Sequence, residues 1–580
     1  MNKVLVIGLD GADWSVILPL AAAGKMPNMA RLLQEGSHGP LRSSNPPITF
    51  PAWSSFMTGV NPGKHGIYDF CERVPGEMQV KFYNATDIQR EPIWRVLNRE
   101  NKSTAFVGVP LTYPPEPLDG LVIPGFDAPG IGAGKATVDA VYPRSVYDDL
   151  EKRFGGYKVA PNLVSFGPKE LPAALERVKS CLAGKGEIAK YLHGTRDWDF
   201  FMVVFGETDN AGHYFWRFSD PSNPLFDPGQ PELFGAVAEI YGQADELIGQ
   251  LLEASSPETN LIVLSDHGMG GCNDKVIHLN LWLAQEGYLT FKKGGGGLSA
   301  LMRNATAQKL FNWTRDFGVR HIPHSVKKAL FYKTDIAKVI EANIRYGAID
   351  WENTLAYSEE GFQFPSIRVN LKGDDPRGKV SRGQEYENVM KSLTQRLLAW
   401  TDPWSGTKLV KQVQRREEVY SGPLAYKAAD LHLEFNEDGG HIYMCRPSGM
   451  ASQGLPIERL DLTSQKDIDF IWNRNGKHRP EGIFLGYGPA FARGMEVRGM
   501  GLVDMVPLIS YLCGAPIPAD LDGRLATEIL REDFYQRCPP RYQEQRETEQ
   551  REIEQKQESK TYTNEEAKKI EDRLKALGYL

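Results

Sequence analysis

Three short apolar segments, each followed by polar residues that include an aspartate, restrict the fold of this chain more than any other feature. The segments are Val4–Leu9, Phe200–Phe205 and Leu261–Leu264, and the aspartates that follow them are Asp10, Asp209 and Asp266. Continuous apolar runs rich in Val, Ile and Phe are typical of strands buried on both faces, as in a parallel sheet covered by helices. We therefore expect three buried strands, with an aspartate just beyond the end of each.

Segments with a helical spacing of apolar residues lie between these strands. Asn28–Glu35 and Glu239–Glu253 show that spacing, and a further strand-like run spans Gly482–Leu485. Alternating strands and helices predict an open α/β fold, and such sheets place their chemistry at the carboxyl ends of the strands. The sequence thus predicts a mostly parallel sheet covered by helices on both faces, with a site at the edge that carries the aspartates.

The composition argues against several classes of protein. A net charge of -7 and a pI near 6.0 do not suit a protein whose partner is a nucleic acid polymer. No run approaches the roughly 18 apolar residues that span a bilayer, and the N-terminal apolar run is too short and too β-branched for a secretory signal. Six widely spaced cysteines without a CxxC pair fit a reducing compartment, so we expect a cytoplasmic protein.

The chain is long enough for more than one structural unit. Its 580 residues exceed the roughly 250–300 at which a single core stops growing. We expect an N-terminal part of the α/β core at residues 1–290, a basic helical cap insertion at 291–350, a mixed α/β continuation of core and cap at 351–475, the C-terminal part of the core at 476–535, and a charged tail with a terminal amphipathic helix at 536–580.

The segment Lys292–Tyr346 carries the opposite charge to the rest of the chain. It holds eleven Lys or Arg and three acidic residues, a net +8, and a run of glycines precedes its helical part. One interpretation is a solvated insertion. The other is a mobile cap over the site, which would attract an anionic substrate. Contact with an anionic membrane surface is the less favoured alternative.

The tail ends in a segment with clear helix signals. Tyr542–Lys560 is almost entirely charged or polar, and residues 563–566 then form a capping box. An apolar stripe and a glycine stop follow, at Ala567, Ile570, Leu574, Leu577 and Gly578. We expect this helix to dock on the body or on a second copy of the chain, which would make a homo-oligomer. A frayed terminus is the alternative.

Histidines accompany two of the three aspartates. Asp209 and His213 are four residues apart, so both face the same side of a helical turn. His267 directly follows Asp266, whereas His478 has a loop setting between Gly476 and Pro480. Three carboxylates and three imidazoles are enough ligands for two divalent metal ions, and this mixture suits Zn²⁺, or less well Mn²⁺.

Ordered motifs give these residues a family context. The chain reads T-x-P at residues 49–51, T-G-x-x-P-x-x-H-G-I at 58–67, D-x-x-x-H at 209–213, D-H-G at 266–268, and a late histidine before a G-I-F strand. Together with Asp10, this order resembles the type I phosphodiesterase/nucleotide pyrophosphatase branch of the alkaline phosphatase superfamily. Within that branch it is most similar to intracellular prokaryotic phosphohydrolases and phosphomutases.

The resemblance implies an alkaline phosphatase-like fold and a role for each residue. Thr49 would be the covalent nucleophile at the start of a helix, and the Gly59 and His65-Gly66 positions would shape the turn after it. One metal would be held by Asp10, Thr49, Asp266 and His267, and the other by Asp209, His213 and His478. The expected reaction is hydrolysis of a small-molecule or lipid-like phosphate ester through phosphothreonine. Transfer to another acceptor and a non-catalytic scaffold are the alternatives.

Two departures from related patterns bear on specificity. The run from Thr49 to Trp53 lacks the cysteine or serine motif of sulfatases, so sulfatase activity is not expected. Nucleotide pyrophosphatases of this branch have an asparagine three residues after H-G-I, where this chain has Phe70. We therefore expect Phe70 at the substrate and a different phosphate donor, for which nearby Arg73 is a candidate.

Overall fold

The computed structural model describes residues 3–73, 80–131, 134–164, 166–292, 349–360, 364–374, 377–451, 453–543 and 562–579. Most of the basic segment Lys292–Tyr346 and of the charged spacer Tyr542–Lys560 lies outside these residues. The cap interpretation and the domain boundaries therefore stay predictions.

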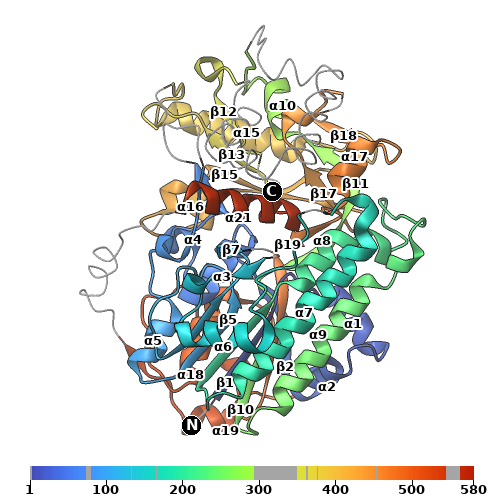
Figure 1. Ribbon diagram of the computed structural model, residues 1–580. Coiled ribbons are helices and arrows are strands. Elements are labelled where there is room, and N and C mark those ends of the chain that lie inside the picture. The colour runs from blue at the N-terminus through green and yellow to red at the C-terminus, as the bar shows by residue number, and fades with distance from the viewer. Residues whose placement is uncertain are drawn as a thin grey trace.

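A large twisted sheet forms the body of the molecule (Figure 1). Its strands follow the order β21-β2-β20-β10-β1-β9-β5-β6, and β22 also pairs with β2. Their bounds are β1 (Lys3–Leu9), β2 (Ser37–Arg42), β5 (Thr104–Val109), β6 (Gly120–Pro124), β9 (Phe200–Phe205), β10 (Thr259–Leu264), β20 (Glu481–Tyr487), β21 (Met495–Glu496) and β22 (Met500–Gly501). The three predicted strands are β1, β9 and β10, so that prediction is confirmed.

The pairing of these strands explains where their ends meet. β1 lies between β9 and β10 and runs parallel to both, with Ile7 opposite Val203 and Val263. β5 is parallel to β9 and β6, whereas β20 is antiparallel to β10 and β2. The sheet is thus mostly parallel, as predicted, and the residues after β1, β9 and β10 meet at one edge.

Helices cover both faces of this sheet. One face carries α3 (Thr49–Thr58), α5 (Ile93–Arg99) and α18 (Met505–Leu512), and the other carries α1 (Trp14–Ala22), α2 (Pro27–Glu35), α7 (Leu171–His193), α8 (Glu207–Ser219) and α9 (Ala236–Glu253). On the face that carries α3, α5 and α18, Val6 lies in a hydrophobic core with Trp53 and Leu508. Its neighbour Ile7 lies in the core on the opposite face, with Ile240. Side chains alternate across a strand, so an apolar strand supplies both cores.

A smaller unit sits beyond the edge that carries the aspartates (Figure 1). It contains two sheets, ordered β16-β17-β11-β18 with β19 beside β11, and β12-β13-β15-β14. The bounds are β11 (Gly268–Ile277), β12 (Ala356–Tyr357), β13 (Ser366–Val369), β14 (Val410–Arg415), β15 (Leu431–Phe435), β16 (Glu437–Asp438), β17 (His441–Cys445), β18 (Ile457–Arg459) and β19 (Gly476–Arg479), with helices α10 (Leu279–Gln285), α15 (Gln384–Ala399), α16 (Arg416–Val419) and α17 (Gln465–Ile471). Because β11 follows β10 and pairs with β17, it connects the two units.

Short elements complete the described chain. They are the strand pairs β3 (Cys71–Arg73) with β4 (Val80–Phe82), β7 (Gly130–Ile131) with β8 (Lys135–Ala136), and β23 (Ile517–Pro518) with β24 (Tyr542–Gln543), and the helices α4 (Pro62–His65), α6 (Arg144–Phe154) and α19 (Glu532–Arg537). Within the described ranges, the helices are all too short or too polar to cross a bilayer.

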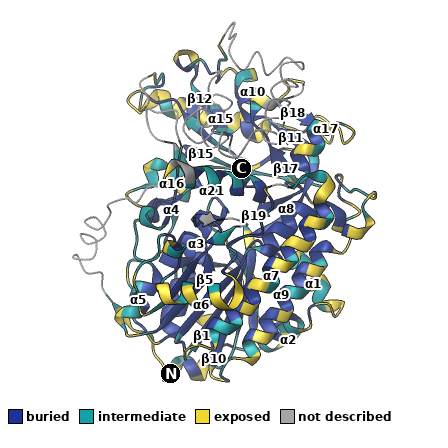
Figure 2. Cartoon of the chain, in the orientation of Figure 1, coloured by how far each residue is buried: buried dark blue, intermediate teal, exposed yellow. Residues whose placement is uncertain are grey.

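The C-terminal helix α21 (Asn564–Leu577) lies between the two units (Figure 1). The predicted capping box and glycine stop are both present, at Thr563 and Gly578. Its apolar stripe is buried against the body of the same chain (Figure 2), with Leu574 0% exposed. The expected docking is therefore observed within one chain, and a homo-oligomer stays a prediction.

Candidate active site

The structure brings together all seven residues expected to hold metal or act as the nucleophile. Asp10 directly follows β1, Asp209 and His213 lie on the first turns of α8, and Asp266 and His267 lie between β10 and β11. Thr49 is the first residue of α3, as predicted. Each of the seven side chains is at most 2% exposed: Asp10, Thr49, Asp209, His213, Asp266, His267 and His478.

The position of His478 differs from the sequence prediction. It lies in β19, where it pairs with Met269 of β11, and not in a loop. The loop prediction was wrong because glycine and proline flank the histidine, while the strand partner that decides its conformation is about 200 residues away. The pairing holds His478 beside the end of β10 with more rigidity than a loop would give.

One group of ligand atoms consists of Asp209, His213 and His478. Asp209 Oδ1 lies 3.4 Å from His213 Nε2 and 3.3 Å from His478 Nε2. The two Nε2 atoms are 3.0 Å apart. The three atoms thus converge on one point, as the ligands of a single cation would.

A second group surrounds His267 Nε2. This atom lies 3.6 Å from Asp10 Oδ1, 3.3 Å from Asp266 Oδ2 and 3.5 Å from Thr49 Oγ1. Asp209 is close to this group too, because atoms of Asp10, Asp209 and His267 all lie within 4.8 Å of one another. The rings of His267 and His478 stack with centroids 3.6 Å apart, so the two groups are contiguous.

The three histidines share one tautomer. The Nδ1 atoms of His213, His267 and His478 lie 3.0, 3.1 and 3.0 Å from the backbone carbonyls of Gly476, Gly268 and Pro47. A carbonyl oxygen only accepts, so each Nδ1 must carry the proton, and each Nε2 presents a lone pair to the centre. Two lone pairs facing each other at 3.0 Å repel unless a cation lies between them. Such backbone-oriented imidazoles are typical metal ligands.

The three aspartates show a matching pattern. One oxygen of each is held by a donor: Asp10 Oδ2 by the Trp53 indole at 3.2 Å, Asp266 Oδ1 by the Gly11 N–H at 3.2 Å, and Asp209 Oδ2 by the Tyr579 hydroxyl at 2.7 Å. The other oxygen of each is buried without a hydrogen-bond partner among the described residues. These are the oxygens that face the histidine Nε2 atoms. A buried carboxylate oxygen without a partner is costly unless a cation neutralises it.

Burial shifts the pKa values of these carboxyls. It raises the pKa of Asp10, and the negative charges of Asp266 and Asp209 raise it further. Burial likewise raises the pKa of Asp266. At Asp209 burial also disfavours the carboxylate, and protonated His213 and His478 would outweigh it and lower the pKa. With the neutral tautomer described above, a bound cation would take over that role. Divalent cations would reverse the cost at Asp10 and Asp266, because a bound ion is the largest local charge in such a site. The donor set therefore fits divalent metal ions.

Backbone geometry makes room for this cluster. Gly11 has a φ of +64°, and a Cβ there would lie 2.9 Å from Asp209 Oδ1. A side chain at this position would therefore be strained and would crowd the ligand. The hydroxyl of Thr208 donates to the Asp10 carbonyl at 2.6 Å, which ties the first turn of α8 to the end of β1.

The nucleophile candidate heads a helix whose end is shaped as predicted. Gly59 ends α3 in the left-handed conformation, and His65 Nε2 lies 3.0 Å from Ser55 Oγ on the same helix. His65 is fully buried, and burial lowers its pKa to about 3. His65 therefore connects the turn to α3 through Ser55.

The substrate-binding candidates are placed unequally. Phe70 is fully buried and packs against Phe50, Phe126 and Tyr579 beside the ligand cluster. The side chain of Arg73 lies outside the described residues, so its role as a phosphate donor stays a prediction.

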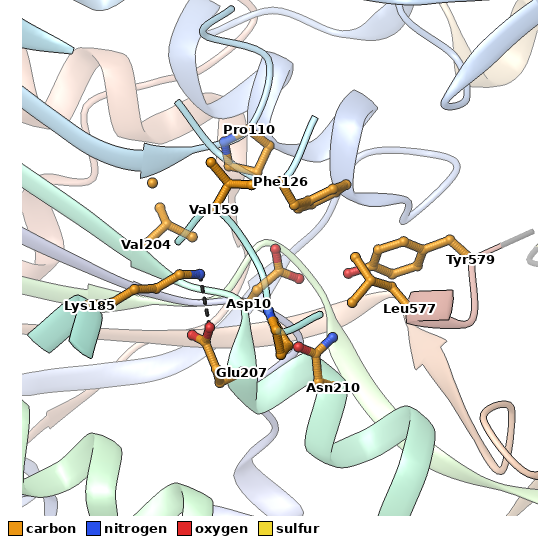
Figure 3. A pocket seen from close by; sticks show the side chains of 13 residues that line it. Asp10, Pro110, Phe126, Val159, Lys185, Val204, Glu207, Asn210, Leu577 and Tyr579 are labelled. Carbon is orange, nitrogen blue, oxygen red and sulfur yellow. Dashed lines mark ion pairs between the residues drawn. The ribbon is translucent and has the colours of Figure 1, made fainter. Parts of the chain in front are cut away.

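Sequence reasoning missed three groups at the site. Trp53 and Tyr579 hold the carboxylates of Asp10 and Asp209. A buried ion pair, Lys185 with Glu207 at 2.9 Å, lies beside Asp10 (Figure 3). Trp53 could have been found, since it lies one helical turn after Thr49 on the predicted helix. The other groups carry no local signal in the sequence.

The chain is similar to known proteins in its sequence profile and in its fold. The profile of the type I phosphodiesterase / nucleotide pyrophosphatase family matches residues 4–446. A comparison with curated protein sequences finds no match. The chain is similar to human ectonucleotide pyrophosphatase / phosphodiesterase 5, with a TM-score of 0.46, 15% identity, and 91% of this chain and 100% of that chain covered.

The fold is supported by a solved structure of another protein. Phosphonoacetate hydrolase from Sinorhizobium meliloti 1021, in complex with phosphonoformate, matches with a TM-score of 0.50 and 14% identity. The match covers 89% of this chain and 95% of that chain. The alkaline phosphatase-like fold is thereby confirmed. Because the family profile spans most of the chain, this protein belongs to the type I phosphodiesterase / nucleotide pyrophosphatase family of phosphoester hydrolases.

Proposed function

We propose that this protein is a two-metal phosphohydrolase that cleaves a phosphate ester through a phosphothreonine at residue 49. A phosphodiester is the favoured substrate, and a monoester is the second choice. The observation that carries the proposal is the centre itself: three imidazole lone pairs converge on three unpartnered carboxylate oxygens beside the Thr49 hydroxyl. Family membership supports the reaction class.

Two metal ions are assigned to the two groups of ligands. Asp10, Thr49, Asp266 and His267 would hold one, and Asp209, His213 and His478 the other. Zn²⁺ suits this mixture of nitrogen and oxygen ligands best, and Mn²⁺ is the alternative. When bound, the two ions would lower the pKa of the Thr49 hydroxyl and neutralise charge on the leaving oxygen.

The residues of the chain position the Thr49 hydroxyl for its attack. Thr49 Oγ1 is held 3.5 Å from His267 Nε2, whose lone pair cannot donate a proton to it. Thr49 loses its hydroxyl proton to solvent and attacks phosphorus, and the P–O bond to the leaving group breaks, so that the group departs as an alkoxide that takes up a proton from water. A water molecule later attacks the same phosphorus, which releases the phosphate product and restores the Thr49 hydroxyl. The N–H groups of Thr49 and Phe50 at the start of α3 are free to bind a phosphate oxygen, whereas Pro51 has none.

Capture of the phosphothreonine by an alcohol would make the same site a phosphotransferase or phosphomutase. Hydrolysis is the preferred proposal, and a non-catalytic scaffold is less favoured because no metal-ligand position is lost. The substrate is proposed to be a small-molecule or lipid-like ester, and the location cytoplasmic.

Substrate preference tests the proposed reaction. The purified protein loaded with Zn²⁺ or Mn²⁺ should hydrolyse bis-p-nitrophenyl phosphate faster than p-nitrophenyl phosphate. The reason is the proposed preference for a diester, because both esters release the same p-nitrophenolate and differ only in the second aryl group on phosphorus. The visible absorbance of the released p-nitrophenolate gives kcat/KM for each ester. Hydrolysis of neither ester with either metal would contradict the proposal.

Metal content tests the ligand assignment. Elemental analysis should give close to two metal ions per chain, since each ion needs about four ligands once water is included. His478→Ala should lose mainly the metal on the Asp209 side, and His267→Ala mainly the metal beside Thr49. His432, which bonds the Ala429 carbonyl in the smaller unit, provides the control His432→Ala with both metals kept. Two metals in all three variants would show that the assignment is wrong.

A further inference from the structure

The C-terminal helix brings a side chain into the metal-ligand cluster. α21 begins at a capping box, where the Thr563 hydroxyl accepts from the Glu566 N–H at 3.3 Å. Its apolar stripe, represented by Ile570 and Leu574, lies in the same core as Phe70. A lone helix of this length is marginal in water, so docking onto this core stabilises it.

Polar contacts fix the last two turns of the helix. The guanidinium of Arg573, 9% exposed, donates to the carbonyls of Phe126 and Ala128. Asn473 Nδ2 donates to the Lys575 carbonyl at 3.0 Å. The Tyr214 hydroxyl donates to the Ala576 carbonyl. Carbonyls in the last turn have no partner within the helix, so these donors satisfy them and fix the register of α21 on the body.

A tight turn after the helix then points the chain inward. Gly578 has a φ of +91°, and a Cβ there would lie 2.3 Å from the Asn473 carbonyl oxygen. Glycine is therefore required by both conformation and space. The turn places Tyr579 beside the ligand cluster, where its side chain is 2% exposed.

The Tyr579 ring is held on several sides. It stacks on Phe70 with centroids 4.9 Å apart, lies 5.4 Å from Phe126, and meets the His213 ring edge-on at 5.4 Å. Its hydroxyl donates to Asp209 Oδ2 at 2.7 Å. Figure 3 shows Tyr579 with Leu577 on one side of the pocket beside Asp10, across from the Lys185–Glu207 ion pair.

We propose that Tyr579 is a positioning residue, which fixes the Asp209 carboxylate so that Oδ1 faces His213 and His478. The assignment rests on the proposed role of Asp209 as a metal ligand. A carboxylate can rotate about its last bond, and a donor on one oxygen determines where the other points. Trp53 and Gly11 hold the carboxylates of the other two aspartates in the same way. The C-terminal tail thus supplies the third such donor.

Removing the Tyr579 hydroxyl distinguishes a positioning role of this side chain from a packing role. Tyr579→Phe keeps the ring and its stacking but removes the donor to Asp209. Competition with a chromophoric chelator should show that one of the two Zn²⁺ ions binds about 10- to 100-fold more weakly, as for other partners of metal ligands. The second ion should bind as in the wild type. With Co²⁺ in place of Zn²⁺, the visible absorption of the weakened site should change.

The control removes a hydroxyl that anchors the same helix but touches no carboxylate. Tyr214→Phe loses the bond to the Ala576 carbonyl and should keep both affinities. Unchanged affinities and Co²⁺ spectrum in Tyr579→Phe would overturn the positioning role while leaving the proposed function intact. An equal loss in both variants would overturn it too, because helix docking would then be the cause. A wild-type protein without bound metal would overturn both proposals.

Discussion

Replacing Thr49 with alanine is expected to lower phosphate-ester hydrolysis by at least about a thousandfold, as loss of a covalent nucleophile does in other enzymes. The variant should keep both metal ions, because Asp10, Asp266 and His267 still surround the site next to residue 49. Thr49→Ser should retain part of the rate, since it keeps the hydroxyl. The measurements are kcat/KM on bis-p-nitrophenyl phosphate and elemental analysis of the same preparations.

A matched control comes from the other end of the same helix. Thr58 is buried in α3 and its hydroxyl bonds the Ser54 carbonyl at 2.6 Å, away from the ligand cluster. Thr58→Ala should leave kcat/KM within a few-fold of the wild type. Full activity in Thr49→Ala would rule out Thr49 as the nucleophile, whatever the control shows.

Truncation after Pro540 is expected to destabilise the whole protein. It removes α21, whose Ile570, Leu574 and Leu577 are at most 2% exposed, together with Tyr579. Each fully buried side chain of this size contributes about 1.5–3 kcal/mol, so the loss is on the order of 5 kcal/mol or more. Truncation also uncovers Phe70, which should reduce solubility. Thermal melting and size-exclusion chromatography of the truncated and full-length chains measure these effects.

A single substitution in α21 shows whether the loss of stability comes from this helix and not from shortening the chain. Leu574→Ala in the full-length protein should lower the free energy of unfolding by about 2–5 kcal/mol, the usual cost of a cavity in a core. Exposed Lys391 on α15 offers the comparison Lys391→Ala, which should change stability by less than about 0.5 kcal/mol. A truncated chain with the melting temperature, solubility and oligomeric state of the full-length protein would show that the tail contributes nothing.

The sequence was informative where structure depends on short segments. The apolar run before Asp10 predicted β1, because a strand buried on both faces has few polar residues. The same reasoning placed Asp209 and Asp266 at the sheet edge. The motif around Thr49 likewise predicted the start of α3 correctly.

Residues whose conformation depends on distant partners were not predictable in this way. His478 was expected in a loop, but its pairing with Met269 makes it part of a strand. Tyr579 contacts Asp209 across 370 positions of the sequence. The apolar stripe of α21 predicted that the helix is buried, but not that its end reaches the ligand cluster.

The contact with Tyr579 gives a physical reason for a phenylalanine at residue 70. Phe70 was expected at the substrate, because related nucleotide pyrophosphatases have an asparagine there. In this chain the Phe70 ring stacks on Tyr579, so an apolar contact helps to hold the C-terminal tail. The phosphate donors that would replace the asparagine remain a prediction at Arg73, and the basic segment at residues 292–346 remains a predicted cap.

The central claim is that phosphate is transferred to Thr49, and trapping that intermediate tests it most directly. The metal-loaded protein should be mixed with bis-p-nitrophenyl phosphate, quenched in acid within the first turnovers, digested, and analysed by mass spectrometry. We predict one phosphate on the peptide that contains Thr49, and none on that peptide in Thr49→Ala. Rapid hydrolysis with no phosphate at Thr49 at any quench time, or with phosphate on a different residue, would contradict the mechanism.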